Sequence, residues 1–171
     1  MPSLHGRESG LAPILGDDPK VLILGSFPSR MSIERGLYYA NPRNHFWRIM
    51  RILLDIPQDE EISRTYYRLK DHRIALWDMV ESRRFQPGSM DHDIRDARLN
   101  DILGFLELHP SVRFIGLNGS KAWTYFLRII HEKTPPKNLV CRRLPSTSPA
   151  NARYSLEDKI REWGIILDYL L

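Results

Sequence analysis

Residues 24–47, LGSFPSRMSIERGLYYANPRNHFW, bring aromatic, amide and hydroxyl side chains into one connection. A turn that only reverses the chain needs two or three Gly, Pro, Asn or Asp residues, so this connection requires another explanation. Long loops commonly carry function. Side-chain amides such as those of Asn41 and Asn44 can form hydrogen bonds without ionising, and Tyr38 and Tyr39 add aromatic rings.

The sequence lacks the motifs of several other chemistries. The turn GSFPSR has one glycine and contains neither a GxGxxG pattern nor a Lys-Ser or Lys-Thr pair, which excludes the common nucleotide cradles. No GxSxG nucleophile elbow occurs. The six histidines never fall at HExxH spacing, and only Asp-His-Asp at 91–93 resembles a metal-ligand run. A solvated turn or cap is the preferred interpretation of that run, so we expect no metal.

The remaining amides, hydroxyls, aromatics and arginines suit a reaction that needs little help from acids, bases or metals. Hydrolysis of the bond between a base and its sugar passes through an oxocarbenium-like state. A protein then mainly has to position water, stack the base and hydrogen-bond the leaving group. A base within a duplex must first be rotated out, which requires phosphate contacts and a wedge.

The chain is basic, with a formal net charge of +4 and a pI of about 9.3. Basic clusters beside polar loops suit a polyanion, because neutralising phosphates releases counterions. Solvated surface charge on an ordinary basic protein is the alternative. The clustered arginines lie near the opening stretch and around LPSTSPANAR: Arg35, Arg43, Arg48 and Arg51, and Arg142, Arg143 and Arg153.

The length of 171 residues fits a single domain, 1–171, which can bury about two thirds of its unfolded surface. The single Cys141 excludes an intramolecular disulfide and any cluster of several thiolates, which favours a reducing, cytoplasmic location. No N-terminal run resembles a signal sequence, and no stretch of about 20 apolar residues could span a bilayer. We expect a monomer with no cofactor and no membrane partner.

Apolar runs and helical stripes predict the elements that position these side chains. Residues 1–19 are expected to form a loose N-terminal arm, followed by a core over 20–171. Within helices, Ser120 is a predicted cap, and Ser155 with Asp158 is a predicted capping box. Predicted strands cover 20–27, 74–80, 112–119 and 137–144, and predicted helices cover 45–56, 60–73, 99–109, 120–133 and 155–170.

This alternation predicts an α/β fold with three αβα layers and a mostly parallel central sheet. Ligands of such sheets bind outside the carboxyl ends of the strands. The loops after Gly25 and Leu144 both leave strands at that edge. We therefore expect the two loops to share one cleft.

Several motifs in order resemble the uracil-DNA glycosylase superfamily: ILGSFPS, YANPRNHFW and LPSTSPANARYSLEDKI, together with LWD and GSMD. Over about residues 21–167 they are most similar to the hypoxanthine-DNA (deoxyinosine) glycosylase branch. The resemblance implies a helix-sandwiched parallel sheet, no cofactor and monofunctional excision of a deaminated base from DNA. Phe27 stands where most branches carry a water-positioning Asn or Asp. The resemblance therefore points to Asn44 for the water or base contact, with Asn41 as the substitute.

The resemblance also implies two binding regions. Tyr39 matches an aromatic residue that stacks on the flipped base, and the loop 146–150 matches one that presses into the duplex. The implied base pocket consists of Gly25, Ser26, Phe27, Pro28, Tyr39, Asp78 and Asn118. The implied DNA contacts are Ser146, Thr147, Ser148, Pro149, Ala150, Arg153 and Arg43.

Each assignment has a structural alternative. Asn44 could cap the helix that follows, Asp78 could bind backbone N–H groups at a strand end, and 146–149 could be an ordinary turn. For Trp47 and Trp77, packing in the core is the preferred interpretation. For Tyr38 and Tyr39, packing on the sheet edge is the alternative.

These residues and motifs support three functions. The first is a DNA glycosylase that removes hypoxanthine above all, or uracil or xanthine, from double- or single-stranded DNA. The second is a catalytically inactive nucleic-acid-binding module that kept the fold after Phe27 replaced the catalytic amide. The third, a hydrolase or binder of free nucleosides, would not need the basic residues. Abasic sites distinguish the first from the second, and poor DNA binding marks the third.

Overall fold

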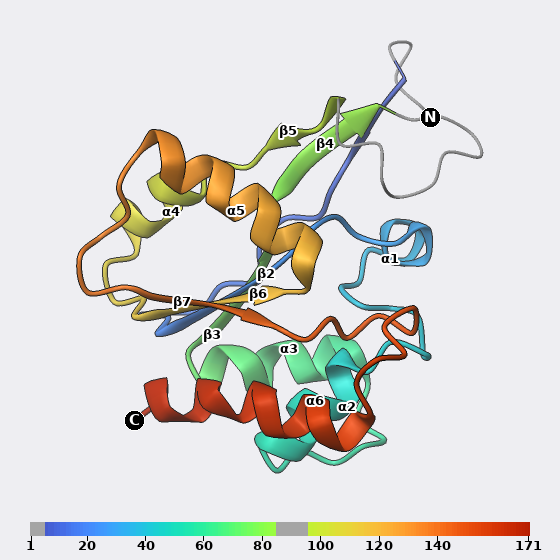
Figure 1. Ribbon diagram of the computed structural model, residues 1–171. Coiled ribbons are helices and arrows are strands. Elements are labelled where there is room, and N and C mark those ends of the chain that lie inside the picture. Colours follow the sequence, from blue (N-terminus) through green and yellow to red (C-terminus); the bar gives the residue numbers. More distant parts are fainter. Residues whose placement is uncertain (1–5, 85–95) are drawn as a thin grey trace.

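The computed structural model describes residues 6–84 and 96–171, and at its centre lies a four-stranded parallel sheet (Figure 1). All three neighbouring pairs run parallel. The order across the sheet is β3-β2-β6-β7, and the four predicted strands are thereby confirmed. Their bounds are β2 Val21–Gly25, β3 Ile74–Asp78, β6 Phe114–Asn118 and β7 Val140–Leu144.

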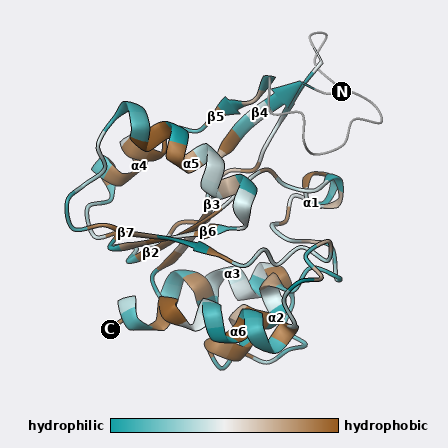
Figure 2. Cartoon of the chain, in the orientation of Figure 1, coloured by the Kyte–Doolittle hydropathy of each residue, from teal (hydrophilic) through white to brown (hydrophobic). Residues whose placement is uncertain are grey.

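Helices cover both faces of this sheet, which confirms the three αβα layers (Figure 1). One face carries α4 Ile102–Leu108 and α5 Ser120–Glu132. The other carries α2 Phe46–Leu53, α3 Ile62–Asp71, α6 Leu156–Trp163 and the 3-10 helix η2 Gly164–Tyr169. Figure 2 shows hydrophobic residues along the strands and in patches on the flanking helices.

The continuous apolar run of β2 follows from burial on both faces. Val21 and Ile23 pack into the core under α2, α3 and α6, whereas Leu22 and Leu24 pack into the core under α4 and α5. Alternate side chains of a strand point to opposite faces, so a covered strand needs apolar residues throughout. Trp47 is buried in the first core, as predicted, and Trp77 is only partly buried beside the second.

A second, antiparallel sheet was not predicted. It has the order β1-β4-β5, formed by Arg7–Ser9, Val80–Arg84 and Arg98–Leu99. Residues 6–19, the described part of the predicted N-terminal arm, therefore do not form a loose arm. Ile14 also bridges to Leu76 of β3. The three polar residues of β1 show no strand pattern in the sequence. Contacts with β4 hold them in place, and in one of these Arg7 Nη2 donates to the Ser82 carbonyl at 3.1 Å.

Helix ends agree with the sequence in part. The capping box of Ser155 and Asp158 is present. The predicted cap at Ser120 is wrong, because Gly119 is the N-cap and Ser120 is the first helical residue. A short helix, α1 Arg30–Arg35, lies inside the connection expected to be a loop, and Ser29 caps it by accepting from the Ser32 N–H.

Some predicted features fall outside the described residues. They are residues 1–5 of the arm, the GSMD segment at 88–91 and the Asp-His-Asp run at 91–93. Among the helices that are described, none combines the length and apolar character needed to cross a membrane.

Gly119 lets the turn from β6 to α5 touch the loop that follows β7. Its φ is 91°, in the left-handed region, and its N–H donates to the Leu144 carbonyl at 3.0 Å. A Cβ on this residue would lie 3.0 Å from the Cβ of Ser146. Both the backbone conformation and the close approach therefore require glycine.

We expect Gly119→Ala to lower the free energy of unfolding by about 1–3 kcal/mol, because alanine would hold a strained φ and press on Ser146. The matched control is Gly164→Ala, where φ is −57° and a Cβ would meet its nearest neighbour at 3.9 Å. That control should change stability by less than about 1 kcal/mol. Urea denaturation of both variants measures the difference, and equal effects would contradict the assigned role of Gly119.

Candidate active site

A pocket of about 240 Å³ opens at the carboxyl edge of the parallel sheet. Four segments enclose it: the β2 loop, the end of β3, the end of β6 and the loop after β7 (Figure 1). The predicted sharing of one cleft by the two loops is confirmed. The lining residues are Gly25, Ser26, Phe27, Pro28, Ser29, Ser32, Tyr38, Tyr39, Asn41, Asn44, Asp78, Asn118, Ser146, Thr147, Ser148 and Pro149.

Most of the described lining residues are polar, and none of them is basic. Among them, apart from the tyrosines, Asp78 is the one ionisable residue. The described residues hold no group of three or more His, Cys, Asp or Glu side chains suited to a metal. This lining favours a neutral, hydrogen-bonding ligand over a phosphate, because anions bind where cationic groups or helix N-termini converge.

Tyr38 anchors the loop that follows α1. Its N–H donates to the Tyr66 hydroxyl at 2.6 Å, and its own hydroxyl donates to the Ala12 carbonyl at 2.8 Å. The Trp47 indole N–H donates to the Tyr38 carbonyl at 2.8 Å. Buried and fully engaged, Tyr38 plays the packing role that was the alternative for it in the sequence.

Tyr39 points the other way and helps to form the pocket. Its ring stacks on Phe46 with centroids 4.0 Å apart, and its hydroxyl accepts from Asn118 Nδ2 at 3.1 Å. Its φ of 51° is uncommon for a bulky residue and raises the backbone energy. Strain of this kind persists where surrounding contacts impose it, and it clusters at functional sites.

The amides of Asn41 and Asn44 both line the pocket, each oriented by a backbone N–H. Oδ1 of Asn44 accepts from Phe46 at 2.9 Å, and Oδ1 of Asn41 accepts from Arg43 at 3.0 Å. Helix α2 begins at Phe46 and its N-cap is His45, so Asn44 is not the N-cap that the sequence offered as its alternative role but lies one residue before it. Each amide oxygen keeps a lone pair, and neither NH₂ group has an acceptor within the described residues, so both can bind a ligand.

Asn118 joins the two sides of the pocket. Its Nδ2 donates to the Tyr39 hydroxyl and, at 3.0 Å, to Oγ1 of Thr147, while its Oδ1 accepts from the Thr147 N–H at 3.0 Å. Thr147 is consequently 0% exposed, unlike the exposed Pro149 and Ala150 of the same loop. Asn118 lies in the pocket as predicted, with its amide hydrogens engaged by the protein.

Asp78 is a buried carboxyl at the end of β3, opposite Gly25 of β2. It is 4% exposed, and burial raises its pKa to about 7. A Cβ on Gly25 would lie 2.5 Å from Oδ1 of Asp78, so glycine makes room for the carboxyl. Oδ2 is buried and has no hydrogen-bond partner among the described residues, so the predicted alternative of binding backbone N–H groups does not account for this oxygen.

Sequence reasoning missed a buried lysine beneath the site. Lys159 of α6 is 1% exposed, and its Nζ lies 3.2 Å from Nδ1 of His45. The His45 N–H donates to the Thr147 carbonyl at 2.9 Å, so α6 supports both loops. Burial lowers the pKa of both Lys159 and His45. A signal was present in the sequence, because the i, i+4 spacing of Lys159 and the buried Trp163 places both residues on one face of the helix.

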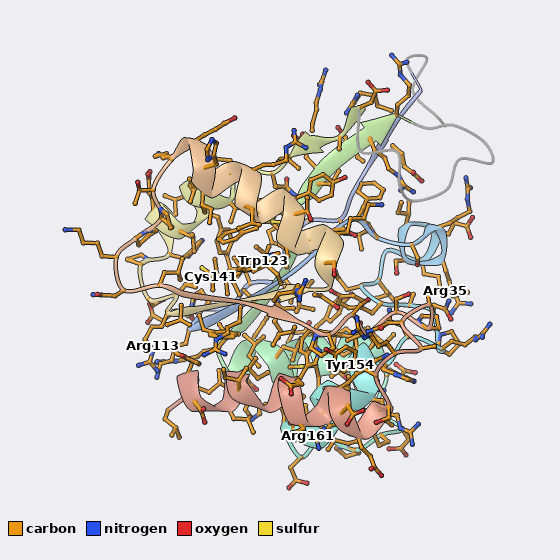
Figure 3. The ribbon with its side chains drawn as sticks, viewed as in Figure 1. Arg35, Arg113, Trp123, Cys141, Tyr154 and Arg161 are labelled. Atoms are coloured by element: carbon orange, nitrogen blue, oxygen red, sulfur yellow. The ribbon has the colours of Figure 1, made fainter. Side chains whose placement is uncertain are left out.

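The predicted DNA contacts divide between two surfaces. Arg153 and Ala150 line a second groove of about 510 Å³, which shares Ser146 and Ser148 with the pocket and also contains Arg143 and Tyr154. Arg43 is exposed and lines neither cavity. Figure 3 shows Arg35 and Tyr154 on the side of the molecule where α1 and the loop after β7 lie.

Comparisons with known proteins bear on the family and the fold. The profile of the Uracil DNA glycosylase superfamily matches residues 13–167, and the resemblance inferred from the motifs is thereby confirmed. Two proteins named Hypoxanthine DNA glycosylase are similar to this chain, each match covering 92% of this chain and 96% of the relative. The one from Methanosarcina acetivorans is 37% identical over 160 residues, and the one from Methanosarcina barkeri is 29% identical over 165.

A solved structure is also similar. It is the solution NMR structure of a candidate uracil DNA glycosylase from Methanosarcina acetivorans, with a TM-score of 0.80 and 34% sequence identity. The match covers 96% of this chain and 98% of the other. The fold therefore agrees over nearly the full length of both chains.

The lowered pKa of His45 predicts a weaker acid response when this residue is replaced. Below the unfolded pKa of about 6.5 the unfolded chain binds the proton more readily, so the free energy of unfolding falls as the pH drops. We expect His45→Asn, which keeps an acceptor near Lys159 and cannot titrate, to lose less stability between about pH 7.5 and 5.5 than the wild type. Denaturation at both pH values measures this, with exposed His131→Asn as the control. Equal losses in all three proteins would contradict it.

Proposed function

This chain belongs to the uracil-DNA glycosylase superfamily and is a DNA glycosylase, and we propose that the base it excises is hypoxanthine, with uracil or xanthine as lesser substrates. The observation that carries the proposal is a neutral pocket, lined by two asparagine amides, a tyrosine and a buried carboxyl. Two relatives that match over most of their length are named Hypoxanthine DNA glycosylase. Their substrate is transferred to this chain as a proposal.

Hydrolysis breaks the bond between C1′ of the sugar and the base nitrogen. Water adds to C1′, the bonding electrons leave with the base, and an abasic site remains. Asn44 orients this water with the free lone pair of Oδ1, because its bond to the Phe46 N–H leaves a second acceptor direction open. Asn41 lines the same pocket and is the substitute for this role. Positioning accounts for most of the catalysis, since no metal or nucleophile is required.

Tyr39 holds the flipped base in the proposed complex. One face of its ring is covered by Phe46, so a base stacks on the opposite face. Its hydroxyl is fixed by Asn118, which keeps the ring in place before substrate arrives. Gly25, Ser26, Phe27 and Pro28 supply the wall beside it, and the Arg83 guanidinium lies 4.4 Å from the centroid of the Phe27 ring.

DNA binds across the rim of the pocket. Pro149 and Ala150 are exposed and press into the duplex, while the buried Thr147 anchors their loop. Arg153 contacts phosphate from the second groove, and Arg43 contacts the backbone from the opposite loop. A loop that acts as a wedge must be firmly anchored, because a loop that moved away could not offset the free energy of unstacking a base.

We expect Asn44→Ala to lower base excision by roughly 100-fold, the usual loss on removing one preorganised hydrogen-bonding group. The assay uses an end-labelled duplex with one deoxyinosine, single-turnover conditions and alkaline cleavage at abasic sites. Parallel duplexes carry uracil or xanthine. The control is Asn138→Ala, at an exposed position outside the pocket lining, which should excise at the wild-type rate.

The possible outcomes separate the candidates. If Asn44→Ala retains activity and Asn41→Ala loses it, the water-positioning role belongs to Asn41. If wild type leaves every substrate intact yet binds DNA at low salt, the excision proposal fails and a binding module remains. Preferential excision of uracil would overturn only the choice of base.

Arg153→Ala tests the phosphate contact. Affinity for duplex DNA should fall, and the slope of log K against log salt should become shallower by about 1, because one fewer phosphate is neutralised. Fluorescence anisotropy at several salt concentrations gives the slope. Exposed Arg64 on α3 provides the matched control, and Arg64→Ala should keep the wild-type slope. An unchanged slope for Arg153→Ala would remove this residue from the DNA contacts.

A further inference from the structure

The carboxyl of Asp78 has no structural role that its hydrogen bonds explain. The fold uses its backbone, since the Asp78 carbonyl accepts from Asn100 Nδ2 at 2.8 Å and its strand pairs with β2. Its side chain lines the pocket, yet Oδ2 is buried without a partner in the described part of the chain. A buried polar group left without a partner costs stability, so its retention requires a reason.

Within residues 6–84 and 96–171, no charge near Asp78 stabilises its ionised form. The ionisable groups that face it are Tyr38 and Tyr39, and the negative carboxylate would raise the pKa of both hydroxyls. Desolvation is the single cause of the shift in the Asp78 pKa to about 7. The carboxyl is therefore largely protonated below neutral pH, and it then has an O–H to donate.

The other described donors of the pocket are amides and hydroxyls, and those of Asn118 and Thr147 are already engaged. The Asn118 amide hydrogens go to Tyr39 and Thr147, and the Thr147 N–H goes back to Asn118. Among the described residues of the lining, Asp78 is the one acidic side chain. A base that enters this pocket therefore meets, in that part of the chain, one group able to deliver a proton near neutral pH.

We propose that Asp78 is a catalytic residue, the general acid that protonates the departing base. This inference rests on the proposed function. As the bond between C1′ and the base nitrogen breaks, its electron pair moves into the base, and the Asp78 O–H transfers its proton to a ring nitrogen or oxygen of that base. Water adds its oxygen to C1′ and releases one proton, which returns Asp78 to its acid form through solvent. The products are an abasic site and a neutral base, so atoms and charges balance.

General acid catalysis explains the unusual environment of this carboxyl. Hypoxanthine leaves poorly as an anion, and a proton donated in the transition state stabilises the developing charge. An acid is most effective when its pKa lies near the working pH. Burial without a cationic neighbour achieves this at Asp78, whereas an arginine beside it would keep it ionised and remove the proton.

The test is the pH profile of deoxyinosine excision by the full chain, measured in single turnover between about pH 5.5 and 8.5. The wild-type rate should be level below about pH 6 and fall as Asp78 ionises, reaching about tenfold less for each pH unit above its pKa. Asp78→Asn preserves the shape of the side chain and cannot give up a proton. It should be roughly 100-fold slower at about pH 6 and nearly independent of pH.

Asp71→Asn is the matched control, since Asp71 is an exposed carboxyl at the end of α3, away from the pocket lining. It should keep the wild-type rate and profile. Melting curves establish that Asp78→Asn folds, and the wild-type profile alone tests the proposal if it does not. A wild-type rate that is level or rises across this pH range would overturn the general-acid role.

The variant separates a catalytic from a structural role. If Asp78→Asn is slower by the same factor at every pH, Asp78 only shapes the pocket and the inference fails while the proposed function stands. If wild type excises no base at any pH, the proposed function fails first and the general-acid role fails with it. The assignment is supported if Asp78→Asn loses the fall in rate at high pH while the wild type and Asp71→Asn keep it.

Discussion

The amide of Asn118 is the interaction on which the arrangement of the site depends. It is the last residue of β6 and holds the Tyr39 hydroxyl on one side and both polar groups of Thr147 on the other. The Thr147 carbonyl in turn receives the His45 N–H, next to Asn44. Tyr39, the segment that carries Asn44 and the loop after β7 are thus held in place from one strand end. A short side chain on a rigid sheet positions groups more accurately than the loops could position themselves.

Charge is distributed so that the pocket and its rim do different things. The pocket lining holds amides, hydroxyls and one neutralisable carboxyl, whereas Arg143 and Arg153 lie in the adjacent groove. A hydrogen bond is stronger inside a protein than in water, so amides in the proposed base pocket are suited to discriminating the edge of a base. Phosphate contacts are sequence-independent and belong on the wet surface, where they position the duplex without reading it.

The parts of this structure that the sequence predicted are those that depend on burial patterns. Continuous apolar strands such as 21–24 specify a sheet covered on both faces, and parallel strands bring their loops to one edge. That rule placed Tyr39, Asn44 and Asp78 in one pocket. Features held by distant partners were not predictable: β1 is ordered by β4, and Thr147 is buried by Asn118. Lys159 is buried with its Nζ beside His45, a partner 114 residues away that no local pattern identifies.

The span of the contact between Tyr39 and Asn118, 79 residues, has a consequence for how the protein is made. Contacts that close large loops form slowly, because the chain loses entropy before the contact returns any stability. During synthesis, β2 and its loop emerge long before β6 and the loop after β7 exist. The pocket therefore stays open on one side until β6 and the loop after β7 have been made, and it is completed only when the sheet is completed.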